Sequence, residues 1–183
     1  SFYNQRRISL LNAQPNAAHL ALAALETYFQ VHLVTQNVDD LHERAGSSSV
    51  LHLHGELTKS RSTKNPSLVY DIQGEGLRLG DLCEEGSQLR PHIVWFGEPV
   101  PLMDQAIEIV SQADIFLVVG TSLAVYPAAS LIFYVGRDVP KYIVDPVLPE
   151  VPDGVSCVEC IQKKASVGVG ELAEHLIGQY SLS

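Results

Sequence analysis

Three segments of the sequence end a predicted strand with small or polar residues that suit a nucleotide. In an open parallel sheet, ligands bind at the carboxyl ends of the strands. Amide and carboxylate groups can bind a ribose or a carboxamide, glycine lets the backbone approach a phosphate, and hydroxyls can donate to it. Strand ends are often polar because they lead into turns, so only the three segments together favour a nucleotide. The residues are Gln36, Asn37 and Asp39, then Gly120, Thr121 and Ser122, and finally Asp145.

A pair of histidines in the segment 51–55 (LHLHG) offers an acid–base group. Alternation along a strand places His52 and His54 on one side, so they either share a role or divide between core and site. Gly55 permits a sharp bend directly after His54. A histidine titrates near neutral pH and can act as a general base, although most histidines only satisfy the core or the surface. Spacing does not decide between these interpretations.

The hydrophobic pattern around these residues alternates between helix and strand. It predicts helices over 17–29, 103–113, 127–135 and 168–177, and strands over 31–35, 93–96, 114–119 and 141–145. Short connections and the apolar strand at 114–119 predict an α/β fold with a doubly wound, Rossmann-like parallel sheet. The stretch 57–89 is polar and without sustained periodicity. We therefore expect a small inserted lobe over 57–89, and a Rossmann-like domain formed by 1–56 and 90–183.

Charge and composition restrict the partners. The chain of 183 residues has a net charge of −9 with only 12 Lys and Arg, which argues against direct nucleic-acid binding and is compatible with basic peptides. The sequence contains neither an apolar run long enough to cross a bilayer nor an apolar leader, so no membrane partner and a cytoplasmic location are expected. Cys157 and Cys160 have C-x-x-C spacing without a second pair, so we expect ordinary half-buried residues near a strand.

Four motifs, in this order, resemble the sirtuin family of NAD-dependent protein-lysine deacylases. They are 35–46 (TQNVDDLHERAG), 52–55 (HLHG), 90–98 (RPHIVWFGE), and 120–122 with 126–129 (GTS and YPAA). The resemblance covers nearly the whole chain. It is greatest for the bacterial and mitochondrial branch that removes acidic acyl groups. It implies NAD as a co-substrate and acyl-lysine proteins or peptides as partners, and it leaves the oligomeric state open.

The resemblance also implies roles for individual residues. His54 matches the general base, and Asn37 is expected to take part in catalysis. The strand segment with Val94, Phe96 and Gly97 is expected to clamp the substrate peptide between strands. Asp145 stands where the family usually has an asparagine on the adenosine ribose. The expected cofactor-binding residues are Gln36, Asn37, Val38, Asp39, Gly120, Thr121, Ser122, Asp145 and Ala165.

Tyr3 and Arg6 match a Tyr-x-x-Arg pair that the acidic-acyl branch uses to grip a succinyl or malonyl carboxylate. Arginine offers a planar fork to a carboxylate, and tyrosine adds a donor. The alternative is a helix with Arg6 and Arg7 on its solvent side. The implied reaction uses His54 to take a proton from a ribose hydroxyl, and it yields free lysine, nicotinamide and an O-acyl-ADP-ribose.

Two other functions remain open at this point. An NAD-dependent ADP-ribosyltransferase would use the same cofactor, but it would not need the grip of Tyr3 and Arg6 on an acyl carboxylate. A non-catalytic module that binds NAD or ADP-ribose would not need a base at His54.

The sequence departs from the family in two places. The family's lobe usually holds a zinc ion with two C-x-x-C pairs, but Ser62 and Asn65 occupy the first pair and only Cys83 remains of the second, so no zinc and no metal ligands are predicted. The family also opens with a strand, a Gly-Ala-Gly-x-Ser loop and an arginine-bearing loop, none of which precedes Ser1. We therefore expect either a longer enzyme of which this is the larger part, or another chain in that place.

Overall fold

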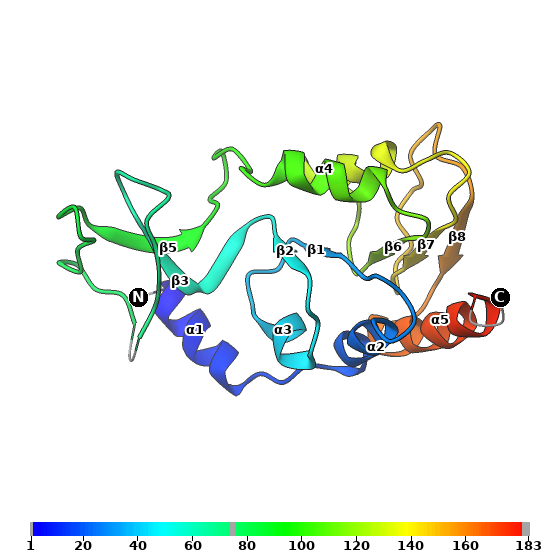
Figure 1. The fold of residues 1–183 in the computed structure, drawn as a ribbon, viewed down its shortest axis with the longest axis horizontal. Coiled ribbons are helices and arrows are strands. Elements are labelled where there is room, and N and C mark those ends of the chain that lie inside the picture. Colours follow the sequence, from blue (N-terminus) through cyan, green and yellow to red (C-terminus); the bar gives the residue numbers. More distant parts are fainter. Residues whose placement is uncertain (1, 74–75, 181–183) are drawn as a thin grey trace.

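The computed structural model describes residues 2–73 and 76–180, and its elements occupy two regions along one long axis (Figure 1). One region contains two parallel sheets. Strands β1 (Leu33–Thr35) and β2 (Val50–His52) form the first, and β6 (Phe116–Val119), β7 (Lys141–Val144) and β8 (Val158–Ile161) form the second. Within the described part of the chain, the two sheets are not hydrogen-bonded to each other. The predicted α/β fold with parallel strands is confirmed.

Helices cover both faces of the larger sheet, as the alternation of its side chains requires. The helices α2 (Ala17–Leu25) and α5 (Ala165–Tyr180) lie on one face, and α4 (Met103–Ser111) and the 3-10 helix η1 (Ala128–Tyr134) lie on the other (Figure 1). Along β7, Tyr142 and Val144 pack into the core under α2 and α5, whereas Ile143 points to the other core. A fully buried strand of this kind is typical of a sheet covered on both faces.

The second region is a three-stranded antiparallel sheet in the order β4 (Val69–Asp71), β3 (Gly55–Ser62), β5 (Leu89–Ile93). The helix α1 (Phe2–Asn12) packs against it, and α3 (Leu41–Ala45) follows β1 (Figure 1). The stretch 57–89, in which the sequence shows no sustained periodicity, therefore contains most of β3 and all of β4. The strand β3 buries small polar side chains, Ser60 and Ser62, and its register with β5 shifts between Glu56 and Ser60. Neither feature produces an apolar alternation in the sequence.

Several predicted elements have different bounds. The strand predicted at 93–96 lies earlier, as β5, and 94–96 lead into a turn. The first helix ends at Leu25 rather than 29, and the helix predicted at 127–135 is 3-10 in type. The last helix is longer than predicted, and β8 was not predicted because half of it is exposed. Helix α2 begins as the sequence suggests, since Asn16 caps it and His19 completes a capping box.

Lys141 is buried at the start of β7, with 2% of its surface exposed. Its ammonium group donates to the carbonyl oxygens of Gly136 at 2.8 Å and Val139 at 2.9 Å, with Arg137 at 3.4 Å. A buried charge is tolerated where every donor has an acceptor. Lys141 therefore closes the turn between η1 and β7.

Candidate active site

The loop after β1 contains the first group of predicted site residues. Its backbone is held in place by neighbouring groups: the N–H of Asn37 donates to Thr35 Oγ1 at 3.1 Å, and the carbonyl of Val38 accepts from the N–H of Leu57 at 2.7 Å. Asp39 Oδ1 accepts from the N–H of Leu41 at 3.2 Å, at the start of α3. These contacts fix the course of the loop without using the side-chain amides of Gln36 or Asn37.

The two histidines approach this loop in different ways. His54 Nδ1 lies 3.2 Å from the carbonyl oxygen of Gln36, which can only accept, so Nδ1 donates this hydrogen bond and leaves Nε2 for another partner. Among the residues that the structure describes, none is recorded as a hydrogen-bond partner of His54 Nε2. His52 has both nitrogens engaged, with Asn37 and with Glu43. Of the two histidines, only His54 therefore has a nitrogen available as a base.

A turn at Gly55 brings His54 against the segment after β5. Gly55 has a φ of +84°, and a Cβ placed on it would lie 2.0 Å from the carbonyl oxygen of His92. The carbonyl oxygen of His54 accepts from the N–H of Val94 at 2.9 Å. The histidine and the segment predicted to hold the peptide are thus joined through the backbone, and a side chain at residue 55 would separate them.

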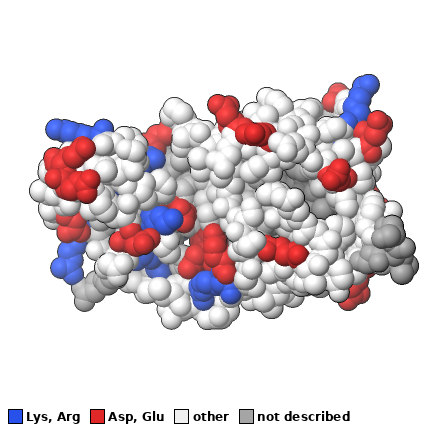
Figure 2. Space-filling model, in the orientation of Figure 1, with Lys and Arg blue, Asp and Glu red and all other residues white. Residues whose placement is uncertain are grey.

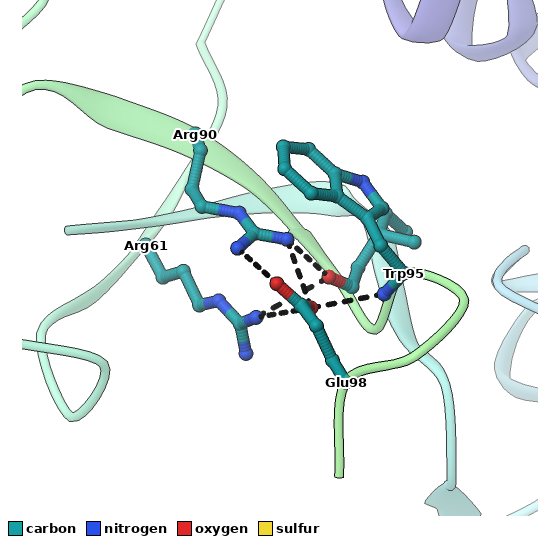
Figure 3. Close-up of polar contacts among 5 residues, drawn as sticks. Arg61, Arg90, Trp95 and Glu98 are labelled. Atoms are coloured by element: carbon teal, nitrogen blue, oxygen red, sulfur yellow. Dashed lines mark hydrogen bonds and ion pairs between the residues drawn. The ribbon is translucent and has the colours of Figure 1, made fainter. Parts of the chain in front are cut away.

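A charged cluster fixes the turn that follows β5 (Figure 3). Glu98 accepts from Arg90 at 2.6 Å and 3.1 Å, from Arg61 at 3.2 Å, and from the backbone N–H of Trp95 at 2.9 Å. The guanidinium of Arg90 stacks 3.5 Å from the centre of the Trp95 ring. The hydrogen bond from Arg90, followed by that from Trp95, lowers the pKa of Glu98 to about 2.

We expect the stabilisation by Glu98 to depend on pH. Because the folded pKa is depressed, this stabilisation is fully present above pH 4.5 and is lost as the pH falls through about 2. Urea midpoints of the wild type and Glu98→Gln should therefore differ at neutral pH and converge on acidification. A difference that stays constant down to about pH 2.5 would contradict the assignment of the shift to Glu98.

The predicted peptide-binding residues lie in this turn rather than in a strand. The N–H of Val94 is already used by His54, Phe96 is completely exposed, and Gly97 has a φ of +86°. Arg61 is the residue of this cluster that the sequence did not single out. Arg90, Trp95 and Glu98 belonged to a motif, whereas Arg61 lies in the polar stretch that was expected to be irregular.

The structure brings the second group of predicted residues together at the carboxyl ends of β6 and β7. Parallel pairing places Val119 beside Val144, so Gly120 and Asp145 leave the sheet next to each other. Gly120 has a φ of +62° with open space at its Cβ, and Thr121 and Ser122 follow it. Asp145 Oδ1 accepts from the N–H of Val147 at 2.8 Å. Ala165 is the first residue of α5.

Tyr3 and Arg6, one helical turn apart on α1, have different surroundings. Tyr3 packs on the cluster of Leu10, Leu57 and Ile93, next to Val38 of the first loop. The guanidinium of Arg6 is exposed and lies 5.5 Å from the centre of the Phe2 ring. The alternative with both arginines in solvent is wrong for Arg7, which is buried and lines a cavity of about 430 Å³.

Hydrogen-bonded side chains stand where the family has its zinc ligands. The Ser62 hydroxyl accepts from the N–H groups of Lys64 at 3.3 Å and Asn65 at 3.2 Å, and Cys83 Sγ is 3.4 Å away. The hydrogen bond with Ser62 lowers the pKa of the Cys83 thiol. Asn65 Nδ2 donates to Glu85 at 3.1 Å. This donor set does not fit structural zinc, and in the described residues no group of three or more His, Cys, Asp or Glu suits a metal.

We expect the lobe to be stable without metal, because hydrogen bonds occupy the place where thiolates would bind it. A strong chelator should leave the Tm unchanged, and metal analysis of purified protein should find well below one zinc per chain. The Tm would fall with chelator if zinc held β3 and β5 together. A sirtuin with four zinc thiolates, treated in parallel, is the control.

The remaining cysteines differ from the prediction. Cys157 and Cys160 are exposed rather than half-buried, and Cys157 has a φ of +57° before β8.

No helix within residues 2–73 and 76–180 is long and apolar enough to span a membrane.

Comparison with known proteins agrees with the motifs. The Sir2 family model matches residues 1–127. The chain is 55% identical over 159 residues to an NAD-dependent protein deacylase of Helicobacter pylori, covering 86% of this chain and 69% of that protein. It is 49% identical over 182 residues to an NAD-dependent protein deacylase of Bacteroides thetaiotaomicron, covering 97% and 77%.

Solved structures show the same relationship. A Sir2 homologue variant in complex with ADP-ribose superposes with a TM-score of 0.87 at 38% identity, covering 100% of this chain and 74% of that chain. A Sir2–p53 peptide–NAD+ complex superposes with a TM-score of 0.73 at 31% identity, covering 96% and 74%. The resemblance noted in the sequence is therefore confirmed. Together with the positions of the loop 36–39, His54 and Gly120, these matches show that the chain belongs to the Sir2 family.

Proposed function

We propose that this protein is an NAD-dependent protein-lysine deacylase. The observation that supports this proposal most directly is the orientation of His54. Its Nδ1 is held by the carbonyl oxygen of Gln36, and its Nε2 stays available beside the loop 36–39. An imidazole that is oriented by one hydrogen bond and has its second nitrogen available is the arrangement that a general base needs. The names of the relatives and the NAD and ADP-ribose complexes of the structural neighbours support this choice.

The proposed overall reaction converts NAD, an acyl-lysine and water into nicotinamide, free lysine and an O-acyl-ADP-ribose. Within it, Gln36, Asn37, Val38 and Asp39 would bind the nicotinamide and its ribose. His54 would take the proton of a ribose hydroxyl at Nε2. The remaining dinucleotide would lie against Gly120, Thr121, Ser122, Asp145 and Ala165, where an open glycine and hydroxyls suit phosphate and a carboxylate suits ribose.

The acyl-lysine would approach between His54 and the turn at 94–98. The exposed aromatic ring of Phe96 offers an apolar contact, and Figure 2 shows acidic side chains spread along the face without a broad basic patch. Such a surface favours basic peptides over nucleic acid. For an acidic acyl group, Tyr3 and Arg6 would supply the donors, with Arg6 turning from its position over Phe2.

The test is to incubate this chain with NAD and one peptide in acetyl-lysine, succinyl-lysine and unmodified forms, while following nicotinamide and peptide mass. Deacylation releases one nicotinamide per acyl group lost. A gain of ADP-ribose on the peptide would instead support the transferase, and NAD binding without any product would support the binding module. Arg6→Met should slow succinyl removal roughly ten- to hundredfold and leave acetyl removal unchanged, with exposed Arg137→Met as the control.

A further inference from the structure

His52 is almost fully buried beside the first loop, with 7% of its surface exposed, and hydrogen-bond acceptors face both nitrogens of its ring. Nδ1 lies 3.2 Å from the carbonyl oxygen of Asn37, and Nε2 lies 2.7 Å from Glu43 Oε1. A carbonyl oxygen and an ionised carboxylate can only accept hydrogen bonds. Both partners are therefore satisfied at once only when both ring nitrogens donate.

The contact between His52 and Asn37 is one of three hydrogen bonds to successive backbone carbonyl groups of the loop. Three successive carbonyl groups of the loop, those of Gln36, Asn37 and Val38, face His54, His52 and the N–H of Leu57. The Asn37 peptide is fixed at its other end as well, because its N–H donates to Thr35 Oγ1. The orientation of the Asn37 peptide therefore depends on a donor at His52 Nδ1.

A neutral His52 would satisfy only one of its two partners. If the single proton were on Nε2, facing Glu43, the lone pair of Nδ1 would point at the Asn37 oxygen and repel it. The carboxylate of Glu43 favours protonation of Nε2 in addition to Nδ1, since a buried imidazolium is stabilised by an adjacent anion.

We propose that Glu43 and His52 form a positioning pair that holds the Asn37 carbonyl, and with it the nicotinamide end of the loop 36–39, through a doubly protonated ring. This inference rests on the proposed function. His52 is a positioning residue and His54 the base, so the two histidines of one motif have separate tasks.

The surroundings are consistent with one positive charge at this place. His42 lies within electrostatic range of both members of the pair and of Asp39, and His19 is stacked on His42 at a ring distance of 4.7 Å. Burial, followed by the charge of His19, lowers the pKa of His42, which keeps that ring uncharged at neutral pH. Within this group, His52 is therefore the ring proposed to carry the positive charge opposite the carboxylate of Glu43.

The first test counts protons directly, and it does not require turnover. In protein labelled with 15N-histidine at neutral pH, the ring of His52 should show two N–H signals, assigned by their loss in His52→Gln. In Glu43→Gln the amide of the new side chain can donate to Nε2, so the ring should show one N–H, on Nδ1. A single ring proton in the wild type would overturn the proposal.

The second test separates positioning from folding. Glu43→Ala removes the partner that orients the ring at Nε2, so it should weaken NAD binding in calorimetry and raise the KM for NAD about tenfold or more, while the KM for peptide and the Tm stay unchanged. Glu43→Gln should restore both NAD values, because its amide again holds Nε2 and keeps Nδ1 directed at the Asn37 carbonyl. Glu174→Ala removes one exposed charge from α5 and is the control. Equal losses for NAD and peptide would overturn the proposal, whereas tight NAD binding without deacylation would count against the proposed function only.

Discussion

His54→Ala should lower turnover of an acyl-lysine peptide by roughly 10²- to 10⁴-fold, because it removes the imidazole that would accept the proton beside the loop 36–39. The affinity for NAD should change little, since His54 meets the loop through one carbonyl contact, with Gln36. The measurement is the rate of nicotinamide release under saturating substrate, together with calorimetric titration of NAD.

The control for this variant is His175→Ala, which removes an exposed imidazole from α5. It should retain full activity. If His54→Ala lost NAD affinity in proportion to turnover, the histidine would act in binding and the assignment as a base would be wrong. Either conclusion requires that His54→Ala has the same Tm as the wild type, because His54 lies in the connection between β2 and β3.

Gly55→Ala should destabilise the protein by roughly 3–5 kcal/mol, at the upper end of single substitutions. Two costs add: the φ of +84° is unfavourable for any residue with a Cβ, and that Cβ would meet the His92 carbonyl oxygen at 2.0 Å. Relief requires β3 and β5 to separate next to His54, so deacylation should fall together with the free energy of unfolding, measured by urea denaturation.

Substitutions of two other glycines distinguish the cost of the strained φ from the cost of the close contact. Gly86→Ala has the strained φ of +74° but open space, so it should cost about 1–3 kcal/mol. Gly170→Ala, within α5 and also with open space, should be neutral or stabilise by about 1 kcal/mol. If Gly55→Ala were no worse than Gly86→Ala, the close contact with His92 would not exist in solution.

The sequence predicted those parts of the molecule whose physical signal is local. The apolar strands β6 and β7 and the start of α2 at Ala17 follow from the hydrophobic periodicity. The strand β3 was missed because its buried residues Ser60 and Ser62 read as surface. An antiparallel pairing with a register shift depends on partners about thirty residues away, such as Arg61 with Arg90, which no local pattern contains.

The candidate site also combines features that local sequence signals predict with features that depend on distant residues. Residue types at strand ends indicated a nucleotide, and Gly120 with Asp145 do meet through parallel pairing. Spacing could not assign roles to His52 and His54, because the difference between them is made by Glu43 on α3 and by the loop carbonyls. Likewise, the carboxylate of Glu98 is fixed by Arg61, which lies far from it in the sequence.

The buried ammonium of Lys141 has a chemical consequence. Lysines react with activated acyl donors through an accessible amine, and this amine is enclosed by the carbonyl groups of Gly136, Arg137 and Val139. Lys163 and Lys164 have exposed side chains; the amine of Lys163 pairs with Glu171, but neither amine is enclosed by backbone carbonyl groups of the described residues. In a cell rich in acyl thioesters, the folded protein would collect spontaneous acyl marks on its outer lysines and never on Lys141, so an acylated Lys141 would identify chains that were modified before they folded.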